Sequence, residues 1–256
     1  MGVVRPVPGR RLLVRHLAVL GGAGGIGRAL VARALREGWQ VSVLDLPASL
    51  ARHPVPAGVR AIPIEGSDER SVAAAFAQLG DALDGFVNLA GFASPMQRLD
   101  EVEPALWDEV VTGNLRTAFL SARAALPLLA KGEAPAMVLM VSGLAAFTRP
   151  GYGPYAACKA AMVSMTKTLA LEAAPVVRVN AVGPGAVDTA FLRGGTGRSK
   201  EDQPLRLDMA AYAAMIPLKR IALPDDVVGP TLFLLGPDSA YMTGQVLWVN
   251  GGAYMP

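Results

Sequence analysis

The segment "HLAVLGGAGGIGRALVARALREGWQVSVLDL", residues 16–46, runs from a short apolar stretch through a cluster of glycines into a helical pattern. Glycines between a strand and a helix permit a tight turn and let an anion approach the free N–H groups at the helix N-terminus. Two spacings fit, G-x-G-x-x-G beginning at Gly22 and G-x-x-x-G-x-G beginning at Gly21, and both end at Gly27. The turn therefore predicts a site for the phosphates of a dinucleotide, with a plain flexible turn as the alternative.

The apolar run after this helix ends in Asp45, twenty residues beyond Gly25. A carboxylate at that place can accept hydrogen bonds from the ribose hydroxyls of adenosine. It would also repel a 2′-phosphate, and no Lys or Arg follows within the next few residues to compensate. Asp45 thus favours NAD over NADP, the alternative being a turn or helix-capping aspartate.

Apolar, β-branched runs alternate with helical patterns along the rest of the chain, as expected for a parallel sheet covered by helices on both faces. The sequence predicts an α/β fold, a Rossmann-like doubly wound parallel sheet of about seven strands. The expected strands lie at 17–21, 40–45, 59–64, 85–90, 136–142, 176–182 and 245–250. The expected helices lie at 25–37, 69–79, 104–130, 154–173 and 224–236.

The length of 256 residues suits a single domain, so we expect 1–256 to form one catalytic unit. Residues 1–15 are expected to be a short N-terminal tail, with a targeting segment as the alternative. The irregular, polar stretch 186–216 ends in a short helical pattern, "LDMAAYAAMI", and is expected to form a lid over the substrate.

Composition excludes several function classes. Net charge is only +3, no Lys/Arg block stands out, and we expect no nucleic-acid partner. Apolar stretches are broken well short of the roughly 20 residues that a membrane helix needs, so no membrane partner is expected either. The one cysteine, Cys158, suits a cytoplasmic protein, and no Cys/His cluster has the spacing of a metal site.

The stretch "SGLAAFTRPGYGPYAACKAA", residues 142–161, contains two tyrosines upstream of one lysine. Pro154 suits the start of a helix, and residues four apart on a helix share a face, which pairs Tyr155 with Lys159. Tyr152, between two glycines, is expected to lie in a loop or pocket wall. We expect the ammonium and the helix N-terminus to lower the pKa of Tyr155 toward the working range. An exposed Tyr–Lys pair on a helix surface is the alternative.

With these motifs in order, the chain resembles the short-chain dehydrogenase/reductase family, in its simple single-domain subgroup, from about residue 16 to 252. The resemblance rests on "GGAGGIG" at 21–27, "NLAG" at 88–91, Asn114, Ser142, "YAACK" at 155–159, "PGAVDT" at 184–189 and "GQVLWVNGG" near the end.

The resemblance implies a catalytic set of four residues. Tyr155 would be the general acid/base, and Lys159 would bind the nicotinamide ribose. Ser142 would bind the substrate oxygen, and Asn114 would hold a water that connects Lys159 to solvent. A buried asparagine that merely joins two helices is the alternative for Asn114.

The same resemblance assigns the cofactor site. Thr189 would contact the nicotinamide carboxamide, and Asn88 would brace the central strands. The complete expected set for NAD is Gly21, Gly25, Ile26, Gly27, Asp45, Asn88, Ala90, Gly91, Tyr155, Lys159, Pro184, Gly185, Val187 and Thr189.

The implied activity is hydride transfer between a secondary alcohol or ketone and NAD(H). A hydroxyacyl-CoA dehydrogenase, a 3-oxoacyl carrier-protein reductase and a non-catalytic NAD-binding regulator are the alternatives. The expected substrate pocket, Ser94, Leu144, Tyr152 and Phe191, favours a small hydrophobic alcohol or ketone. The resemblance also implies a homotetramer or homodimer formed through helices 104–130 and 154–173.

Four positions depart from the pattern of the family. Leu20 and Leu89 stand where the family usually has a threonine and a second asparagine, and Glu65-Gly66 stand where it usually has Asp-Val. We hypothesise that an apolar contact between Leu20 and Leu89 substitutes for the missing hydrogen bonds. The role of Glu65 at the adenine is left open.

Overall fold

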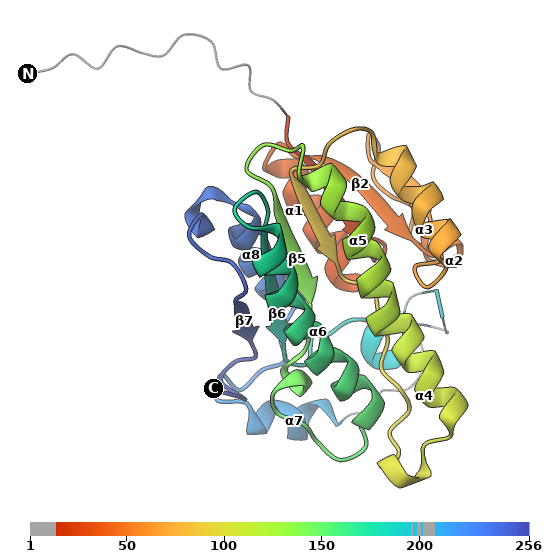
Figure 1. The fold of residues 1–256 in the computed structure, drawn as a ribbon. Coiled ribbons are helices and arrows are strands. Elements are labelled where there is room, and N and C mark those ends of the chain that lie inside the picture. The colour runs from red at the N-terminus through yellow and green to blue at the C-terminus, as the bar shows by residue number, and fades with distance from the viewer. Residues whose placement is uncertain (1–13, 196, 199–200, 202–207, 256) are drawn as a thin grey trace, which may run out of the picture.

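The computed structural model describes residues 14–195, 197–198, 201 and 208–255. Its seven strands form one parallel sheet in the order β3-β2-β1-β4-β5-β6-β7 (Figure 1). From β1 the chain first adds β2 and β3 on one side and then β4 to β7 on the other. The connections that leave β1 and β4 therefore run in opposite directions along the sheet. The strands are β1 His16–Leu20, β2 Gln40–Asp45, β3 Arg60–Pro63, β4 Gly85–Asn88, β5 Ala136–Met140, β6 Arg178–Pro184 and β7 Val246–Val249.

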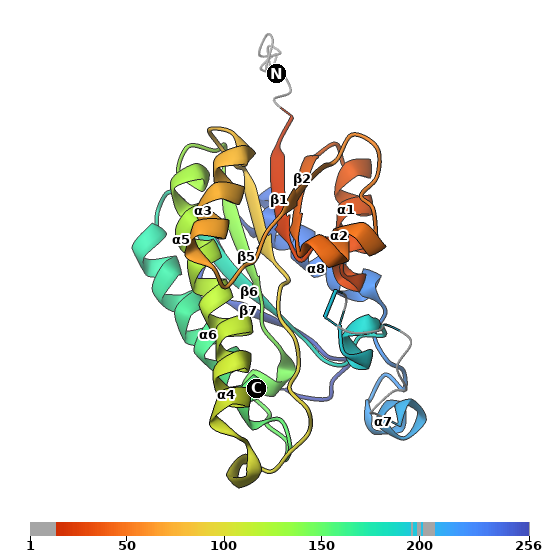
Figure 2. The same ribbon diagram turned by 90° about the vertical axis from the view of Figure 1, so that its right-hand side faces the viewer.

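Helices cover both faces of the sheet, as Figure 2 shows. One face carries α1 Gly25–Arg36 and α8 Pro224–Leu235, and the other carries α3 Glu69–Phe76, α5 Thr117–Leu129 and α6 Gly153–Ala173. Shorter helices are α2 Pro47–Arg52, α4 Pro104–Val111 and α7 Met209–Met215. The predicted doubly wound α/β fold is confirmed.

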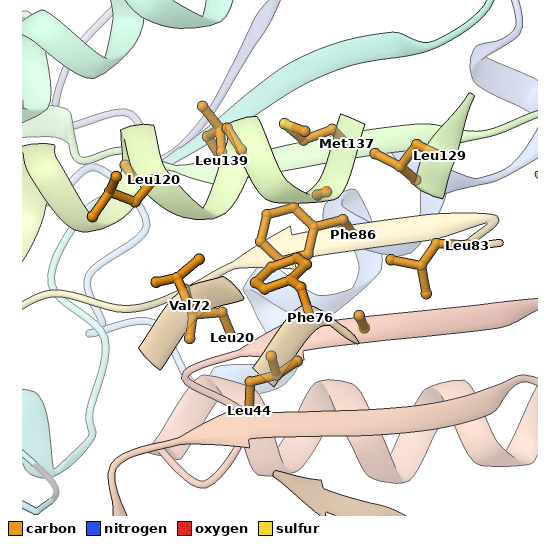
Figure 3. Close-up of a cluster of buried hydrophobic side chains, with 14 of the residues drawn as sticks. Leu20, Leu44, Val72, Phe76, Leu83, Phe86, Leu120, Leu129, Met137 and Leu139 are labelled. Atoms are coloured by element: carbon orange, nitrogen blue, oxygen red, sulfur yellow. The ribbon is translucent and has the colours of Figure 1, made fainter. Parts of the chain in front are cut away.

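Strand side chains alternate between two apolar cores, one on each face. Phe86 of β4 meets Phe76 of α3 edge-on, with ring centroids 5.6 Å apart, in the core that Figure 3 shows. Leu20 belongs to this core, whereas Leu89 packs on the opposite face. The hypothesis of an apolar Leu20–Leu89 contact is therefore wrong. The backbone N–H of Leu89 instead donates to the carbonyl oxygen of Leu20 at 2.8 Å.

Two local features differ from the prediction. The short helix α2 was not expected, and the expected helix 104–130 is two helices joined by a π-helical turn at Thr112–Arg116. Strand and helix limits elsewhere agree within about two residues. Most of the expected tail, 1–13, and lid residues 196, 199–200 and 202–207 lie outside the described residues. The predicted helical stretch at the end of the lid is present as α7.

Candidate active site

A cavity of about 360 Å³ lies at the carboxyl ends of the strands. It extends from Asp45 at the end of β2, across the glycine turn after β1, to Ser142 after β5 and Tyr155 on α6. Sites in doubly wound folds form at this edge because the loops after diverging crossovers leave a crevice there.

The glycine turn is closely packed. A Cβ on Gly27 would clash with the carbonyl oxygen of Gly21, and one on Gly25 would clash with Thr189 across the cavity. Gly21 itself has φ +83°, a conformation that L side chains rarely adopt. The turn ends at the N-terminus of α1, which has no acidic residue in its first turn and no side-chain cap. Backbone N–H groups in such a setting suit an anion.

Asp45 lies beside this turn. One carboxylate oxygen accepts from the backbone N–H of Ala23 at 2.9 Å, and the other accepts from that of Leu46 at 2.8 Å. Burial raises the pKa of Asp45, and these N–H groups, the Ser49 hydroxyl and His53 offset part of the rise because they stabilise the carboxylate.

Helix α6 places the two tyrosines differently. It begins at Gly153, so Tyr152 stands at the N-cap and is half-buried, while Tyr155 lies inside the first turn and is buried. The Lys159 ammonium is 5.5 Å from the centre of the Tyr155 ring. The predicted pairing of Tyr155 with Lys159 on one helix face agrees with this geometry.

Lys159 is buried, and no carboxylate of the described residues pairs with it. Its Nζ donates to the carbonyl oxygen of Met140 at 3.0 Å and contacts Met162 Sδ at 3.7 Å. Ser142, at the end of β5, accepts from the backbone N–H of Leu144 at 3.2 Å and hydrogen-bonds Tyr155.

Burial dominates the acid–base properties of this pair. It raises the pKa of Tyr155 well above its ordinary value, and the hydrogen bond with Ser142 offsets only part of that rise. Burial also lowers the pKa of Lys159 from 10.5 to about 8. The expectation that neighbouring charge lowers the pKa of Tyr155 is therefore wrong for the protein alone, because loss of water penalises the phenolate more than its surroundings stabilise it.

Asn114 lies in the π-helical turn and is fully buried. Its amide donates to the carbonyl oxygens of Phe92 at 3.0 Å and Val110 at 2.9 Å, and its Oδ1 accepts from the backbone N–H of Phe92 at 3.2 Å. The side chain therefore ties the segment after β4 to the α4–α5 junction. These hydrogen bonds satisfy the Asn114 side chain within the protein, but they join a loop to a helical turn and not two helices. The expected water that connects Lys159 to solvent stays a prediction.

Asn88 is also internal, since its amide donates to Ser121 Oγ at 3.1 Å and its oxygen accepts from the backbone N–H of Ala90 at 2.9 Å. Asn88 and Asn114 are the two predicted site residues that do not line the cavity. The predicted residues that do are Gly21, Gly25, Ile26, Gly27, Asp45, Ala90, Gly91, Ser94, Ser142, Leu144, Tyr152, Tyr155, Lys159, Pro184, Gly185, Val187, Thr189 and Phe191.

Ser94 carries the one buried side-chain oxygen or nitrogen that lacks a hydrogen-bond partner among the described residues. Phe147, Arg149 and Tyr254 line the cavity but were not expected from the sequence, whereas Tyr212 lies in the expected lid 186–216. Arg149 had a signal, because it is the sole charged residue between Ser142 and Tyr155. Tyr254 had none, because only tertiary folding brings it to the cavity.

Described residues of the expected lid line the cavity, among them Phe191, Gly195 and Arg198. Arg198 pairs with Glu109 of α4, and its guanidinium lies 3.6 Å from the centre of the Phe92 ring. Glu201 lies 2.9 Å from His53, which follows α2. These contacts tie the segment to α4 and to the residue after α2, and its role as a lid stays a prediction.

Within the described residues, no group of three or more His, Cys, Asp and Glu side chains could hold a metal ion. In the same part of the chain, no helix has the length and apolar character needed to cross a membrane.

Comparisons with known proteins place the chain among oxidoreductases. Residues 21–254 match the family model described as enoyl-(acyl carrier protein) reductase. A 4-formylbenzenesulfonate dehydrogenase of Comamonas testosteroni is 36% identical over 91% of this chain and 95% of that protein. A 2-(S)-hydroxypropyl-CoM dehydrogenase of Xanthobacter autotrophicus is 31% identical over 94% and 97%, respectively.

Among solved structures, a 3-ketoacyl-(acyl-carrier-protein) reductase from Brucella melitensis in complex with NADH superposes with a TM-score of 0.83. It is 28% identical and is matched over 94% of this chain and 98% of that one. The chain therefore belongs to the short-chain dehydrogenase/reductase family of oxidoreductases.

Proposed function

We propose that the protein is an NAD-dependent dehydrogenase that interconverts a secondary alcohol and a ketone. The observation that carries the proposal is the convergence of Ser142, Tyr155 and Lys159 on the cavity that also holds the glycine turn and Asp45. A nicotinamide dinucleotide, when bound, supplies the hydride acceptor or donor.

The residues at the cavity fit such a cofactor. The glycine turn and the uncapped start of α1 would hold the pyrophosphate, and Asp45 would accept from the adenosine ribose. Lys159 would bind the second ribose, and Thr189 and Val187 would line the nicotinamide end. A 2′-phosphate would meet the Asp45 carboxylate, which supports NAD over NADP.

Tyr155 and Ser142 would hold the reacting oxygen. In the reductive direction a protonated Tyr155 donates its phenolic proton to that oxygen, and its raised pKa keeps the proton available at neutral pH. In the oxidative direction Tyr155 accepts the proton, so a charged Lys159 nearby has to stabilise the phenolate. Asn114 would act as a positioning residue, with the water relay implied by the family as a second role.

The proposal is tested by turnover of a ketone and alcohol panel with NADH and NAD, followed at the absorbance of NADH. Tyr155→Phe removes the transferable proton and should lower kcat by about 10²- to 10⁴-fold while cofactor binding persists. Tyr152→Phe is the matched control, because Tyr152 lies outside the helix start, and it should leave the pH profile unchanged. If Tyr152→Phe abolished activity and Tyr155→Phe did not, the assignment would be overturned.

An acyl thioester is the second candidate substrate, supported by the likeness to a 3-ketoacyl-(acyl-carrier-protein) reductase. Acetoacetyl-CoA in the same panel separates the two classes. Turnover of any of these compounds would remove the third alternative, a non-catalytic NAD-binding regulator.

We further propose a homotetramer or homodimer in the cytoplasm. Exposed apolar side chains on the long helices support an oligomer, namely Trp107 on α4, Phe119 on α5 and Leu171 on α6, with exposed fractions of 38%, 50% and 82%. The single buried Cys158 is consistent with a reducing compartment.

A further inference from the structure

Arg149 lies in the loop between β5 and α6 and lines the end of the cavity that Tyr152 also lines. Its guanidinium carbon is 5.1 Å from the centre of the Tyr212 ring and 5.7 Å from that of Phe147. Tyr212 belongs to α7, so the side chain joins the loop after β5 to the helix at the end of the expected lid.

An aromatic wall supports this position. Phe147 stacks on Tyr254 with ring centroids 6.1 Å apart, and Tyr254 meets Trp248 of β7 edge-on at 5.7 Å. Aromatic contacts engage the π-faces of the rings and leave the N–H groups of a guanidinium, which lie in its own plane, able to donate. A planar fork of donors of this kind matches the two oxygens of a carboxylate or sulfonate.

Arg149 has no carboxylate within 4 Å among the described residues, whereas the lid arginines do have one. Arg198 pairs with Glu109, and Arg193 pairs with Asp188 at 3.5 Å. Arg149 is thus a half-buried arginine that packs against aromatic rings and has no counter-ion among the described residues. Such a side chain is suited to bind the anionic group of a ligand.

The carboxylates of the cavity lie elsewhere. Asp45 and Glu65 are the only acidic residues among its described lining. Asp45 ends β2 and Glu65 follows β3, at the end assigned to adenosine. The cations of the described lining are Arg149, Lys159 and Arg198. Because Arg198 pairs with Glu109 and Lys159 lies beside Tyr155, Arg149 is the one of the three that can bind an anionic group of the substrate.

We propose that Arg149 binds an oxyanion of the substrate, a carboxylate or a sulfonate, while the carbonyl or hydroxyl group of the same molecule reacts at Tyr155. This inference rests on the proposed function and narrows its substrate class to anionic ketones and alcohols with an apolar or aromatic body. The aromatic wall contacts that body, and Arg149 sets its orientation. Arg149 is thus a specificity-determining residue of the site.

The test compares matched ketones that differ in charge: 4-acetylbenzenesulfonate and 4-acetylbenzoate against 4-acetylbenzamide, together with their 3-substituted isomers. Arg149→Gln should raise KM for the anionic ketones by roughly 10- to 100-fold, the range expected for loss of a hydrogen-bonded charge pair. The constants of the amide should change much less, because the amide offers no charge for Arg149 to bind. Arg149→Lys, which keeps the charge but not the fork, should give an intermediate KM.

Arg123→Gln is the matched control, because it makes the same substitution at an exposed arginine that pairs with Glu69 on α3, outside the cavity. It should change none of these constants. Higher salt should raise KM of the wild type for the anionic ketones alone, since screening acts on the charge pair. Circular dichroism checks that each variant is folded.

Failure of this inference is distinguishable from failure of the proposed function. If the wild type reduces the ketones but Arg149→Gln affects anionic and neutral ones alike, the inference is overturned and the proposed function stands. If the wild type reduces none of them, the proposed function is overturned for this panel. Calorimetric titration with 4-acetylbenzenesulfonate then decides the inference: binding weakened at least 10-fold in Arg149→Gln supports it, and equal binding, or none to the wild type, overturns it.

Discussion

The burial of a charged Lys159 lowers the free energy of unfolding, and a neutral residue of similar size would remove this cost. Burial lowers its pKa from 10.5 to about 8, and at about 1.4 kcal/mol per pKa unit this corresponds to about 3 kcal/mol against the charged form. Lys159→Met removes that cost but leaves the Met140 carbonyl oxygen without its donor, a loss of about 1–2 kcal/mol. At pH 7 we therefore expect Lys159→Met to be more stable than the wild type by about 1–2 kcal/mol.

The burial cost of the charged Lys159 and the loss of its hydrogen bond to Met140 can be separated, because only the burial cost depends on pH. Between about pH 8 and 10.5 the unfolded wild type binds more protons at Lys159 than the folded protein does, so wild-type stability rises with pH in that window. The loss of the hydrogen bond does not depend on pH. The advantage of Lys159→Met should therefore shrink by about 2 kcal/mol between pH 7 and pH 10. Tyr155 is present in both proteins, and its own titration cancels from the difference.

Urea unfolding at fixed protein concentration, followed by circular dichroism at pH 7, 8, 9 and 10, measures this difference. Lys167→Met is the control, because Lys167 is an exposed lysine on the same helix, and its difference from the wild type should stay nearly constant. If the Lys159→Met and wild-type unfolding free energies ran parallel from pH 7 to pH 10, the lysine would not be buried in its charged form and the reasoning would fail.

Two further predictions concern the cofactor and the assembly. Asp45→Asn keeps the shape of the side chain but removes its charge. The value of kcat/KM for NADP, divided by that for NAD, should therefore rise about 10-fold or more. A wild type that already used both cofactors equally well would contradict the assignment of NAD. Static light scattering at micromolar concentration should give the mass of a dimer or tetramer, and Phe119→Asp should shift it toward the monomer because a charge would be buried in the interface. A monomeric wild type would refute the oligomer.

The sheet, and the edge of it where the strands end at the cavity, could be predicted because they depend on apolar runs and on the positions of glycine and proline in the sequence. Runs such as "AMVLM" at 136–140 are apolar throughout and became β5, which is buried on both faces. Pro154 after two turn-forming glycines indicated where α6 starts, and this start distinguished Tyr155 from Tyr152. In these cases local backbone preference and burial act in the same direction.

Other features were hidden for identifiable reasons. Helix α2 has six residues, too few for a periodic pattern to be recognised. The π-helical turn shifts the helix phase at Thr112–Arg116, which the spacing of Leu106, Val110 and Ala118 does not reveal. Arg149 meets Tyr212 only through tertiary folding, because 62 residues of chain separate the two.

The pKa of Tyr155 shows why charge counting along a helix was insufficient. The sequence placed a lysine four residues away, and that proximity was taken to favour the phenolate. In the structure both groups are buried, and desolvation acts against the charged form of each: it raises the pKa of Tyr155 and lowers that of Lys159. Among the described residues, the hydrogen-bond partners of Lys159 are the Met140 carbonyl oxygen and the Met162 sulfur, and no carboxylate pairs with it. A fold that needed only stability would place an apolar side chain there, so the retention of an unpaired buried lysine beside a buried tyrosine supports a chemical role for the pair.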